Sequence, residues 1–354
     1  MPHRCDARLF PPIMVTIKQV AESAGVSEAT VSRVLNAHPK VNPALRERVL
    51  ATIESLHYQP SSVARSLRRQ QTRTIGLIVP DNRNPFFAEL ARGIEEFCDA
   101  AGYRVYLCNS NDNAQKEIEY CDKLHHQRVA GVIIAITGTT AEGVRYLQGH
   151  GMPVVLLDRG HPDAQADTVQ CDHYRGACEA VDYLLKLGHR RFGLIPGQLH
   201  RPPVQDRLRA CIDLLQKHDL TPACAAIPEP TSGEHFEYEV GYAGAKDLLA
   251  VRKLERPTAL FAFNDAMAIG ALRYALEQRL RVPGELSIVG VDNIPLSSFV
   301  WPSLTTVGQP MTELGRSAAQ LLLDRIEGVH QEIVEKRLLP TLIIRESTGV
   351  VDPT

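Results

Sequence analysis

The spacing of apolar residues near the start of the chain predicts three short helices. Apolar positions recur every three or four residues through two successive stretches: Ile17, Val20, Ala21 and Ala24, then Val31, Val34 and Leu35. Between these stretches, Gly25 can end one helix and Ser27 can begin the next, over residues 28–36. A third amphipathic stretch spans residues 43–56. A tight turn between the first two helices is typical of the helix-turn-helix that binds DNA, and an ordinary helical hairpin is the alternative.

From residue 74 onward, short apolar runs alternate with stretches of helical spacing. The runs, rich in Val, Ile and Leu, lie at 74–80, 104–109, 131–136, 153–158, 191–196, 258–263 and 286–291. The helical stretches between them include 86–101, 116–127, 176–187 and 266–278. This alternation is typical of buried parallel sheets covered by helices on both faces. The expected fold class is therefore α/β: an all-α helix-turn-helix domain and two doubly wound parallel-sheet lobes.

These patterns also predict domain bounds. We expect a tail over 1–15, a DNA-binding domain over 16–60, a hinge helix and linker over 61–73, and a ligand-binding body over 74–350. The first lobe is expected to comprise 74–172 and 304–328, and the second 173–302 and 331–350. The chain would then return between the lobes near Pro302 and again near Gly328.

Composition and motif content exclude several classes of protein. With 44% hydrophobic and 23% charged residues, the chain is neither fibrous nor disordered. No apolar run reaches the roughly 18–20 residues that span a bilayer, and residues 1–12 lack the features of a signal peptide, so we expect a cytoplasmic protein that contacts no membrane. The eight cysteines have no zinc-site spacing, no nucleotide-binding glycine motif opens either lobe, and no catalytic motif stands out. We expect no metal, no cofactor and no enzymatic activity.

The distribution of charge supports a nucleic-acid partner. Residues 16–73 carry nine basic and four acidic side chains, although the whole chain has a formal charge of −2. A small basic unit is thus joined to a larger acidic body. In a helix-turn-helix, the second helix lies in the major groove, so we expect Glu28, Ala29, Ser32 and Arg33 at base edges. The expected phosphate contacts come from Thr30, Ser32, Lys18 and Asn36, and from the helix starts at Thr16 and Ser27.

A segment of about two helical turns follows Tyr58. A helix this short is marginal alone in water and can become ordered on DNA. We expect Leu67 to wedge into a minor-groove step, although packing of Leu67 on the body is the alternative. The other expected contacts of this segment with DNA are Ser61, Ser62, Ala64 and Arg65.

Polar and aromatic residues collect where the predicted strands end. In doubly wound sheets, the carboxyl ends of the strands form the ligand site. The residues at these positions are Asp81, Asn84, Phe86, Phe87, Asp158, Arg159, Arg207, Asn264, Asp265, Asp292, Asn293 and Gln309. Carboxylates, guanidinium groups and aromatic faces together suit the hydroxyls and C–H faces of a sugar ring.

The motifs resemble a known family. Thr16-Ile17-x-x-Val20-Ala21, Ala24-Gly25-Val26-Ser27, Thr30-Val31-Ser32-Arg33-Val34-Leu35-Asn36, and then Tyr58-x-Pro60-x-x-x-Ala64-x-x-Leu67 resemble the signature of lactose-repressor/galactose-repressor (LacI/GalR) regulators. The resemblance implies a hinge helix in the minor groove of a palindromic operator, a homodimer, and a body of the periplasmic-binding-protein type. Met14 matches the usual family start.

The resemblance extends to the effector positions of ribose-type members. It implies sugar contacts at the Asn84, Phe86, Phe87, Asp158, Arg159, Arg207, Asn264-Asp265 and Gln309 positions, with Asp172 and Tyr238 as further effector positions. Three positions depart from the family pattern: Ser61 replaces a hinge Asn, Ala210 replaces a Gly, and His173 replaces an Asn.

The function expected from these observations is a DNA-binding repressor of carbohydrate metabolism genes, controlled by a small, ribose-like sugar. A purine-responsive co-repressed regulator is the first alternative. A sugar receptor is disfavoured by the helix-turn-helix, and a sugar-processing enzyme by the lack of a catalytic motif. Whether the effector induces or co-represses stays open.

Overall fold

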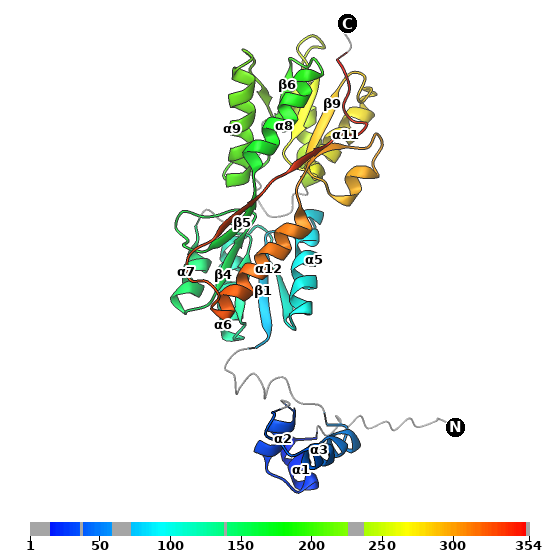
Figure 1. Ribbon diagram of the computed structural model, residues 1–354. Coiled ribbons are helices and arrows are strands. Elements are labelled where there is room, and N and C mark those ends of the chain that lie inside the picture. The colour runs from blue at the N-terminus through cyan, green and yellow to red at the C-terminus, as the bar shows by residue number, and fades with distance from the viewer. Residues whose placement is uncertain (1–14, 36–37, 59–71, 138–139, 226–236, 352–354) are drawn as a thin grey trace, which may run out of the picture. The chain divides into compact units, whose positions relative to one another are not determined.

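A computed structural model describes residues 15–35, 38–58, 72–137, 140–225 and 237–351. The chain divides into two compact units, Met1–Thr72 and Arg73–Thr354 (Figure 1). Within the described residues, no helix combines the length and apolar character needed to cross a membrane.

The first unit is a small helical domain built on caps and a short apolar core. Its helices are α1 (Ile17–Ala24), α2 (Glu28–Leu35) and α3 (Pro43–Ser55). Gly25 ends α1 with a left-handed backbone (φ 64°), which turns the chain sharply into α2. The core side chains are Val20, Ala21, Ala24, Val31, Val34 and Val49. The predicted tight turn between the first two helices is therefore present.

The first lobe of the second unit is a six-stranded parallel sheet covered on both faces. Its strands run in the order β11-β5-β4-β3-β1-β2. Their bounds are β1 Thr74–Val79, β2 Arg104–Asn109, β3 Gly131–Ile134, β4 Val154–Leu157, β5 Asp167–Cys171 and β11 Glu335–Leu338. One face packs on α5 (Pro85–Ala100) and α12 (Met311–Glu327), and the other packs on α6 (Ala114–His126) and α7 (Glu142–Gly149).

The second lobe repeats this plan in the order β12-β10-β9-β8-β6-β7, with β12 antiparallel to β10. Its strands are β6 Phe192–Ile195, β7 Ala223–Cys224, β8 Ala259–Ala262, β9 Ser287–Asp292, β10 Thr305–Gly308 and β12 Thr341–Ile343. Its helices are α8 His173–Lys186, α9 Pro202–Gln216, α10 Glu237–Leu249, α11 Asp265–Glu277 and the 3₁₀ turn η1 Pro295–Ser298. One large apolar core holds the lobe together.

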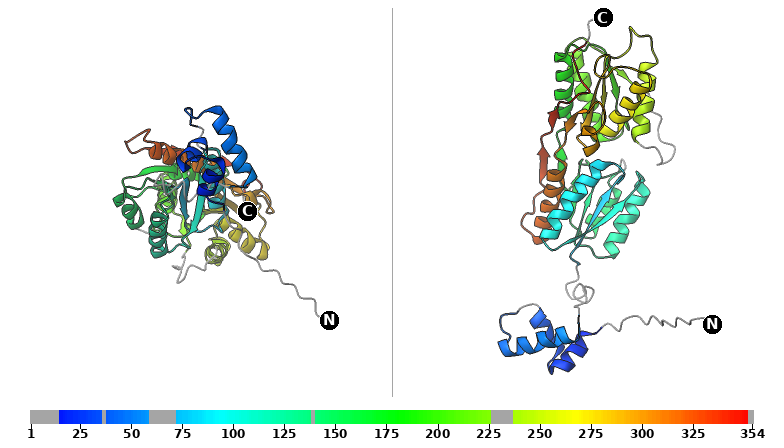
Figure 2. Two further views of the ribbon diagram at one scale, coloured as in Figure 1. Left: turned by 90° about the horizontal axis from the view of Figure 1, so that it is seen from below. Right: turned by 90° about the vertical axis from the view of Figure 1, so that its right-hand side faces the viewer.

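Of the three crossings between the lobes, the first lies at the predicted place and the other two do not. β10 belongs to the second sheet, α12 packs on the first lobe, β11 belongs to the first sheet and β12 to the second. The crossings therefore lie after β5, between β10 and α12, and between β11 and β12, whose strands run along one side of the body (Figures 1 and 2). The expected assignment of 304–328 to the first lobe and of 331–350 to the second is therefore wrong for β10, which joins the second sheet, and for β11, which joins the first. Gly328 caps α12 (φ 72°) and does not mark a crossing. Turn residues mark the end of an element but do not say which sheet the next strand joins.

Candidate DNA interface and effector site

The exposed face of α2 carries the residues predicted to read bases. Glu28, Ala29 and Arg33 are exposed, and Ser32 is half-buried. Lys18 is exposed on α1. The opposite face of α2 packs Val31 and Val34 into the core, so the polar face stays available to a partner.

The helix starts have a structural role in addition to the predicted one. The Thr16 hydroxyl accepts a hydrogen bond from the Gln19 amide at 3.3 Å, and the Gln19 side chain accepts one from the Thr16 amide. The Ser27 hydroxyl likewise accepts from the Thr30 amide at 3.2 Å. These bonds satisfy amides that a helix start leaves without partners. The predicted contacts at Asn36, Ser61, Ser62, Ala64, Arg65 and Leu67 lie outside the described residues.

In the second unit, a buried network joins the two lobes at the ends of their strands. Arg207 on α9 donates to the Phe263 carbonyl at 2.8 Å and to Nδ1 of His173 at 3.1 Å. Nε2 of the same imidazole lies 3.4 Å from the carbonyl of Asp158 in the first lobe. Burial, and then the charge of Arg207, hold the pKa of His173 well below its usual value, so the ring is neutral and accepts at Nδ1.

Asp292 and Gln309 form the second part of this network. Nε2 of Gln309 donates to the Asp292 carboxylate at 2.8 Å. Oε1 of Gln309 is buried and has no hydrogen-bond donor among the described residues. Gln309 and Arg207 line a narrow pocket together with Asp172, His173 and Pro340. A buried acceptor without a partner costs free energy unless a ligand or a water supplies a donor.

Four further residues of the predicted effector site are Asp158, Arg159, Phe86 and Phe87. Arg159 is buried, and desolvation lowers its pKa to about 10 although Asp158 opposes the shift. Asp158 has a left-handed backbone (φ 70°), and burial raises its pKa while Arg159 and Arg207 oppose the shift. The rings of Phe86 and Phe87 are buried and meet edge to face, 5.1 Å between centroids. Buried charged groups together with an aromatic pair are the mixture that a sugar site needs. We define the interlobe site as Asp158, Arg159, Arg207, Asp292 and Gln309.

Asp265 differs from the predicted ligand role. Its carboxylate accepts from the Thr306 hydroxyl at 2.6 Å and from the Ile294 amide at 2.9 Å, so protein donors occupy both oxygens. Its neighbour Asn264 caps α11 by accepting from the Met267 amide at 2.7 Å. Asp292, which also ends a strand, bonds the predicted residue Gln309. The geometry therefore favours Asp292 over Asp265 as the carboxylate of the interlobe site.

Two of the remaining predicted residues cap helices, Asp81 lies in the loop after β1, and Tyr238 lies in the first turn of α10. Asp172 caps α8 by accepting from the Arg175 amide at 3.0 Å. Asn84 caps α5, where its Oδ1 accepts from the Phe86 amide at 2.9 Å. Asp81 accepts from the guanidinium of Arg83 at 2.9 Å. Tyr238 is half-buried in α10, where burial and the nearby Glu237 raise its pKa.

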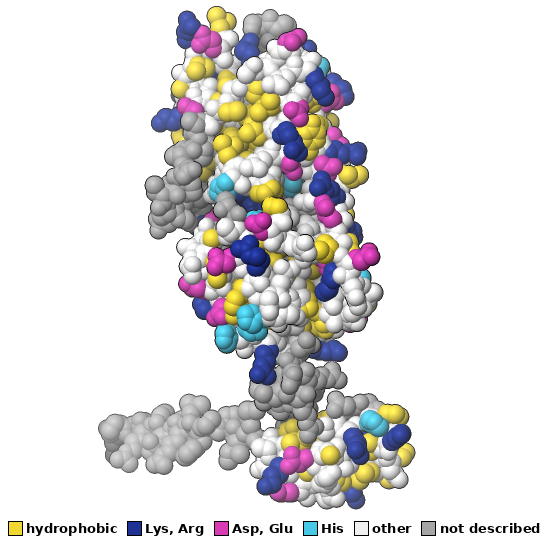
Figure 3. Space-filling model, turned by 90° about the vertical axis from the view of Figure 1, so that its left-hand side faces the viewer, with side chains coloured by type: hydrophobic (Ala, Val, Ile, Leu, Met, Phe, Trp, Pro, Cys, Tyr) yellow, Lys and Arg dark blue, Asp and Glu magenta, His cyan; other side chains and the backbone are white. Residues whose placement is uncertain are grey.

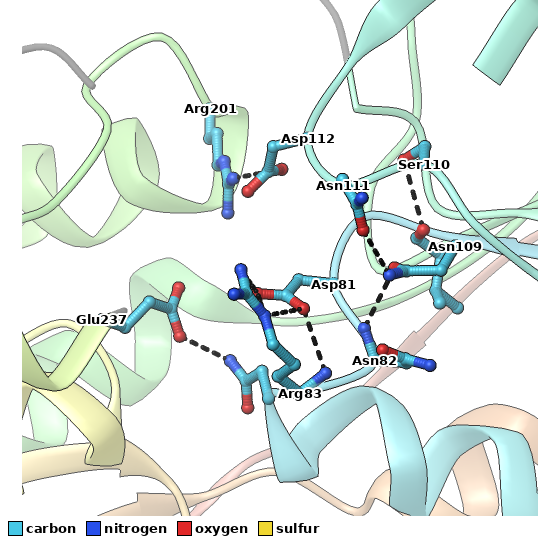
Figure 4. Close-up of polar contacts among 11 residues, drawn as sticks. Asp81, Asn82, Arg83, Asn109, Ser110, Asn111, Asp112, Arg201 and Glu237 are labelled. Atoms are coloured by element: carbon cyan, nitrogen blue, oxygen red, sulfur yellow. Dashed lines mark hydrogen bonds and ion pairs between the residues drawn. The ribbon is translucent and has the colours of Figure 1, made fainter. Parts of the chain in front are cut away.

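Sequence reasoning missed two contacts that join the lobes beside this site (Figure 4). Arg201, just before α9, pairs with Asp112 of the first lobe at 2.6 Å. Nδ2 of Asn84 donates to Oε2 of Glu237, the first residue of α10, at 2.7 Å. Arg201 and Glu237 lie at or next to helix starts. Because neither residue follows a predicted strand, the sequence pattern did not indicate them.

The surface of the body carries mixed charge. In the view of Figure 3, acidic and basic side chains alternate, and hydrophobic side chains collect on one face of the C-terminal lobe. Within the described residues, no group of three or more His, Cys, Asp or Glu side chains is arranged to hold a metal ion.

Comparison with known proteins places both units. Residues 16–61 match the family model "Bacterial regulatory proteins, lacI family", and residues 181–348 match "Periplasmic binding protein-like domain". A protein of Haemophilus influenzae (strain PittEE), described as the HTH-type transcriptional repressor PurR, is 38% identical over 339 residues, which cover 94% of this chain and 98% of that protein.

Two solved structures extend the comparison. A LacI family transcriptional regulator from Enterococcus faecium with bound ribose is 33% identical with a TM-score of 0.71, covering 79% of this chain and all of that one. The lac repressor dimer bound to operator and the anti-inducer ONPF is 27% identical with a TM-score of 0.83, covering 95% and 99%.

Proposed function

This chain belongs to the LacI family of bacterial regulatory proteins, and we propose that it is a repressor whose operator binding is controlled by a small ribose-like sugar held between its lobes. The family supplies the repressor with a DNA-binding domain and an effector-binding domain. The sugar and the residues that hold it are the subject of the proposal.

The orphaned acceptor of Gln309 carries the proposal. Its Oε1 is buried without a donor among the described residues, while its Nε2 is fixed by Asp292. A sugar hydroxyl is both donor and acceptor, so one hydroxyl can donate to Gln309. A neighbouring hydroxyl can donate to Asp292 and accept from Arg207.

The other side chains of the interlobe site suit the same ligand. The carboxylate of Asp158 accepts hydroxyl donors, and the guanidinium of Arg159 donates to hydroxyl oxygens. Phe86 and Phe87 offer an apolar wall for the C–H face of a ring. The bound ribose in the Enterococcus faecium relative supports a pentose rather than a larger sugar.

Operator recognition is proposed for the first unit. Arg33, Glu28 and Ala29 would meet base edges from the exposed face of α2, while Lys18, Thr30 and Ser32 would position the domain on phosphates. The hinge contacts predicted at residues 61–67 belong to the same proposal.

We further propose that two copies bind a palindromic operator as a homodimer. Large apolar side chains are exposed on both lobes: Phe299 and Trp301 of the second lobe are 84% and 77% exposed, and Tyr106 and Leu107 of the edge strand β2 are about half exposed. Exposed apolar residues of this size are typical of a surface that a partner covers.

A purine co-repressor is the second candidate, because the chain is so similar to repressors named PurR. A thermal-shift screen of sugars and purines, followed by operator binding with each hit, decides between the two. Ribose should raise the melting temperature and change operator affinity. If a purine base stabilises the protein and ribose does not, the sugar proposal is wrong.

A further inference from the structure

Three carboxylates surround the place where the lobes meet beside the interlobe site, and only two of them have a cationic partner. Arg83 pairs with Asp81 at 2.9 Å, and Arg201 pairs with Asp112 at 2.6 Å. The third carboxylate, Glu237, has no ion pair among the described residues. Its Oε2 accepts from the side-chain amide of Asn84 at 2.7 Å (Figure 4).

Charged groups of both signs lie near Glu237. Burial raises the pKa of Glu237, and the nearby carboxylates of Asp112 and Asp81 raise it further, while Arg201 and a hydrogen bond from Asn264 oppose the shift. The charge of Arg201 is balanced by Asp112, which its Nη2 contacts, although its buried Nε has no acceptor among the described residues. The structure therefore leaves one surplus negative charge between the lobes.

Glu237 is linked to the interlobe site by contacts and by charge. Asn84, its hydrogen-bond partner, also caps the helix that carries Phe86 and Phe87. Burial raises the pKa of the Asp292 carboxyl, and the charges of Asp265 and Glu237 raise it further. Within the interlobe site itself, two guanidinium groups face two carboxylates, so the surplus at Glu237 is not compensated there.

We propose that Glu237 makes the effector site selective for uncharged ligands over their phosphorylated or carboxylated forms; this rests on the proposed function, in which the interlobe site holds a small effector. A neutral hydroxyl can donate to the carboxylate of Glu237, whose oxygens have several lone pairs. The charges of both nearby guanidinium groups are already balanced by carboxylates, so a phosphate or carboxylate brought to the same place meets the like charge of the half-buried Glu237.

A simpler role for Glu237 is to favour the N-terminus of α10 by its charge. Glu239 provides a matched control, because it lies in the same first turn but is exposed. If the charge of Glu237 acts only on the helix, Glu237→Gln and Glu239→Gln should behave alike toward ligands.

Isothermal titration of the full-length protein with ribose and with ribose 5-phosphate tests the proposal. The wild type should bind ribose about 100-fold or more tightly than ribose 5-phosphate, because a like charge at a desolvated site costs several kcal/mol. Glu237→Gln should reduce that ratio about 10-fold, and Glu239→Gln should leave it unchanged. The phosphate group has the same size in the titration of every variant. A change in the ratio of the two affinities therefore reflects the charge at residue 237.

A second arm does not depend on the sugar. Inorganic phosphate, followed by thermal shift, should stabilise Glu237→Gln more than the wild type or Glu239→Gln. If ribose fails to bind while phosphate still separates the variants, the proposed effector is wrong and the role of Glu237 stands. If Glu237→Gln and the wild type respond alike in the phosphate arm, and their ratios agree wherever ribose binds, charge selection by Glu237 is overturned.

Discussion

Gln309 is the side chain at which a ligand should gain most from a single hydrogen bond. Gln309→Leu keeps the apolar volume but removes the buried acceptor and the donor to Asp292. Effector affinity should fall by about 1–3 kcal/mol, or roughly 5- to 100-fold. Titration calorimetry with ribose measures the loss. Gln320→Leu, on the exposed face of α12, is the control that should bind normally. Unchanged affinity in Gln309→Leu would remove this residue from the site.

Asp265 should affect stability and its pH dependence. Burial raises its folded pKa to about 7, against about 3.9 in an unfolded chain. A raised acid pKa means that the folded state retains the proton, so this contribution is fully present below pH 4 and is lost as the pH rises through 7. Asp265→Asn cannot titrate. The stability advantage of the wild type over this variant should therefore shrink by about 1–3 kcal/mol between pH 5 and 8. Urea unfolding at each pH measures it; a constant difference would contradict the buried titration.

The sequence could predict which residues lie near the ends of strands, but not which of their side chains meet. Asp158 and Gln309 directly follow β4 and β10, whereas Arg207 lies inside α9; the structure joins all three through the network of His173 and Asp292. The sequence could not separate Asn264 from Asp265, because neighbouring side chains point in different directions and only the packed fold fixes which one meets Thr306. No sequence pattern indicates Glu237. Its charge is unbalanced only because Arg201 pairs with Asp112 in the folded protein.

At the scale of elements, α2 should separate sequence reading from electrostatic attraction. Arg33→Ala should weaken binding to a selected palindromic operator by about 1–3 kcal/mol. It should weaken binding to a scrambled duplex less. Lys18→Ala should weaken both duplexes alike and reduce the salt slope by about one. Fluorescence anisotropy at several salt concentrations measures both variants. If Arg33→Ala weakens the two duplexes equally, Arg33 contacts only phosphate.

The pairing of α5 with α12 depends on glycines that let the backbones approach. A Cβ at Gly315 would lie near the Leu90 carbonyl, and one at Gly93 near the Thr312 carbonyl, both closer than real contacts allow. Gly315→Ala should therefore destabilise the first lobe by about 1–3 kcal/mol. Gly149→Ala, at the end of α7, meets nothing within 4 Å and should be neutral or slightly stabilising. Urea unfolding compares them, and equal stabilities would show that α12 can shift without cost.

Apolar periodicity predicted the central elements well. β2 matches its predicted run, and the runs at 131–136 and 258–263 contain β3 and β8. The strands that escaped prediction are β5, β7, β10, β11 and β12, which are short or partly polar. β11, with the sequence Glu-Lys-Arg-Leu, pairs with β5 more than 160 residues away. Such an edge strand is fixed by its neighbour in the sheet and not by its own pattern.

At the scale of the whole molecule, the two lobes are linked by three crossings of the chain. An effector that binds between them can shift the equilibrium between the open and closed arrangements. β10, α12, β11 and β12 pass alternately between the lobes. A ligand shifts such an equilibrium only by its difference in affinity for the two arrangements. Contacts that exist only when the lobes are together, such as the ion pair of Arg201 with Asp112, stabilise the closed arrangement even before a ligand binds.

Asp112→Asn removes that ion pair without touching the interlobe site. The effector-free protein should become more open, with a larger radius of gyration by X-ray scattering, and effector affinity should fall about 3- to 10-fold because closure costs more. Asp206→Asn breaks an exposed ion pair within α9, with Arg209, and should change neither quantity.

Asp112→Asn also reveals whether the effector induces or co-represses, because the binding of operator and the binding of effector are reciprocally coupled. If the effector is an inducer, the more open Asp112→Asn protein should bind operator more tightly without ligand. If it is a co-repressor, operator affinity should fall, and an unchanged affinity would show that lobe closure is not coupled to DNA binding.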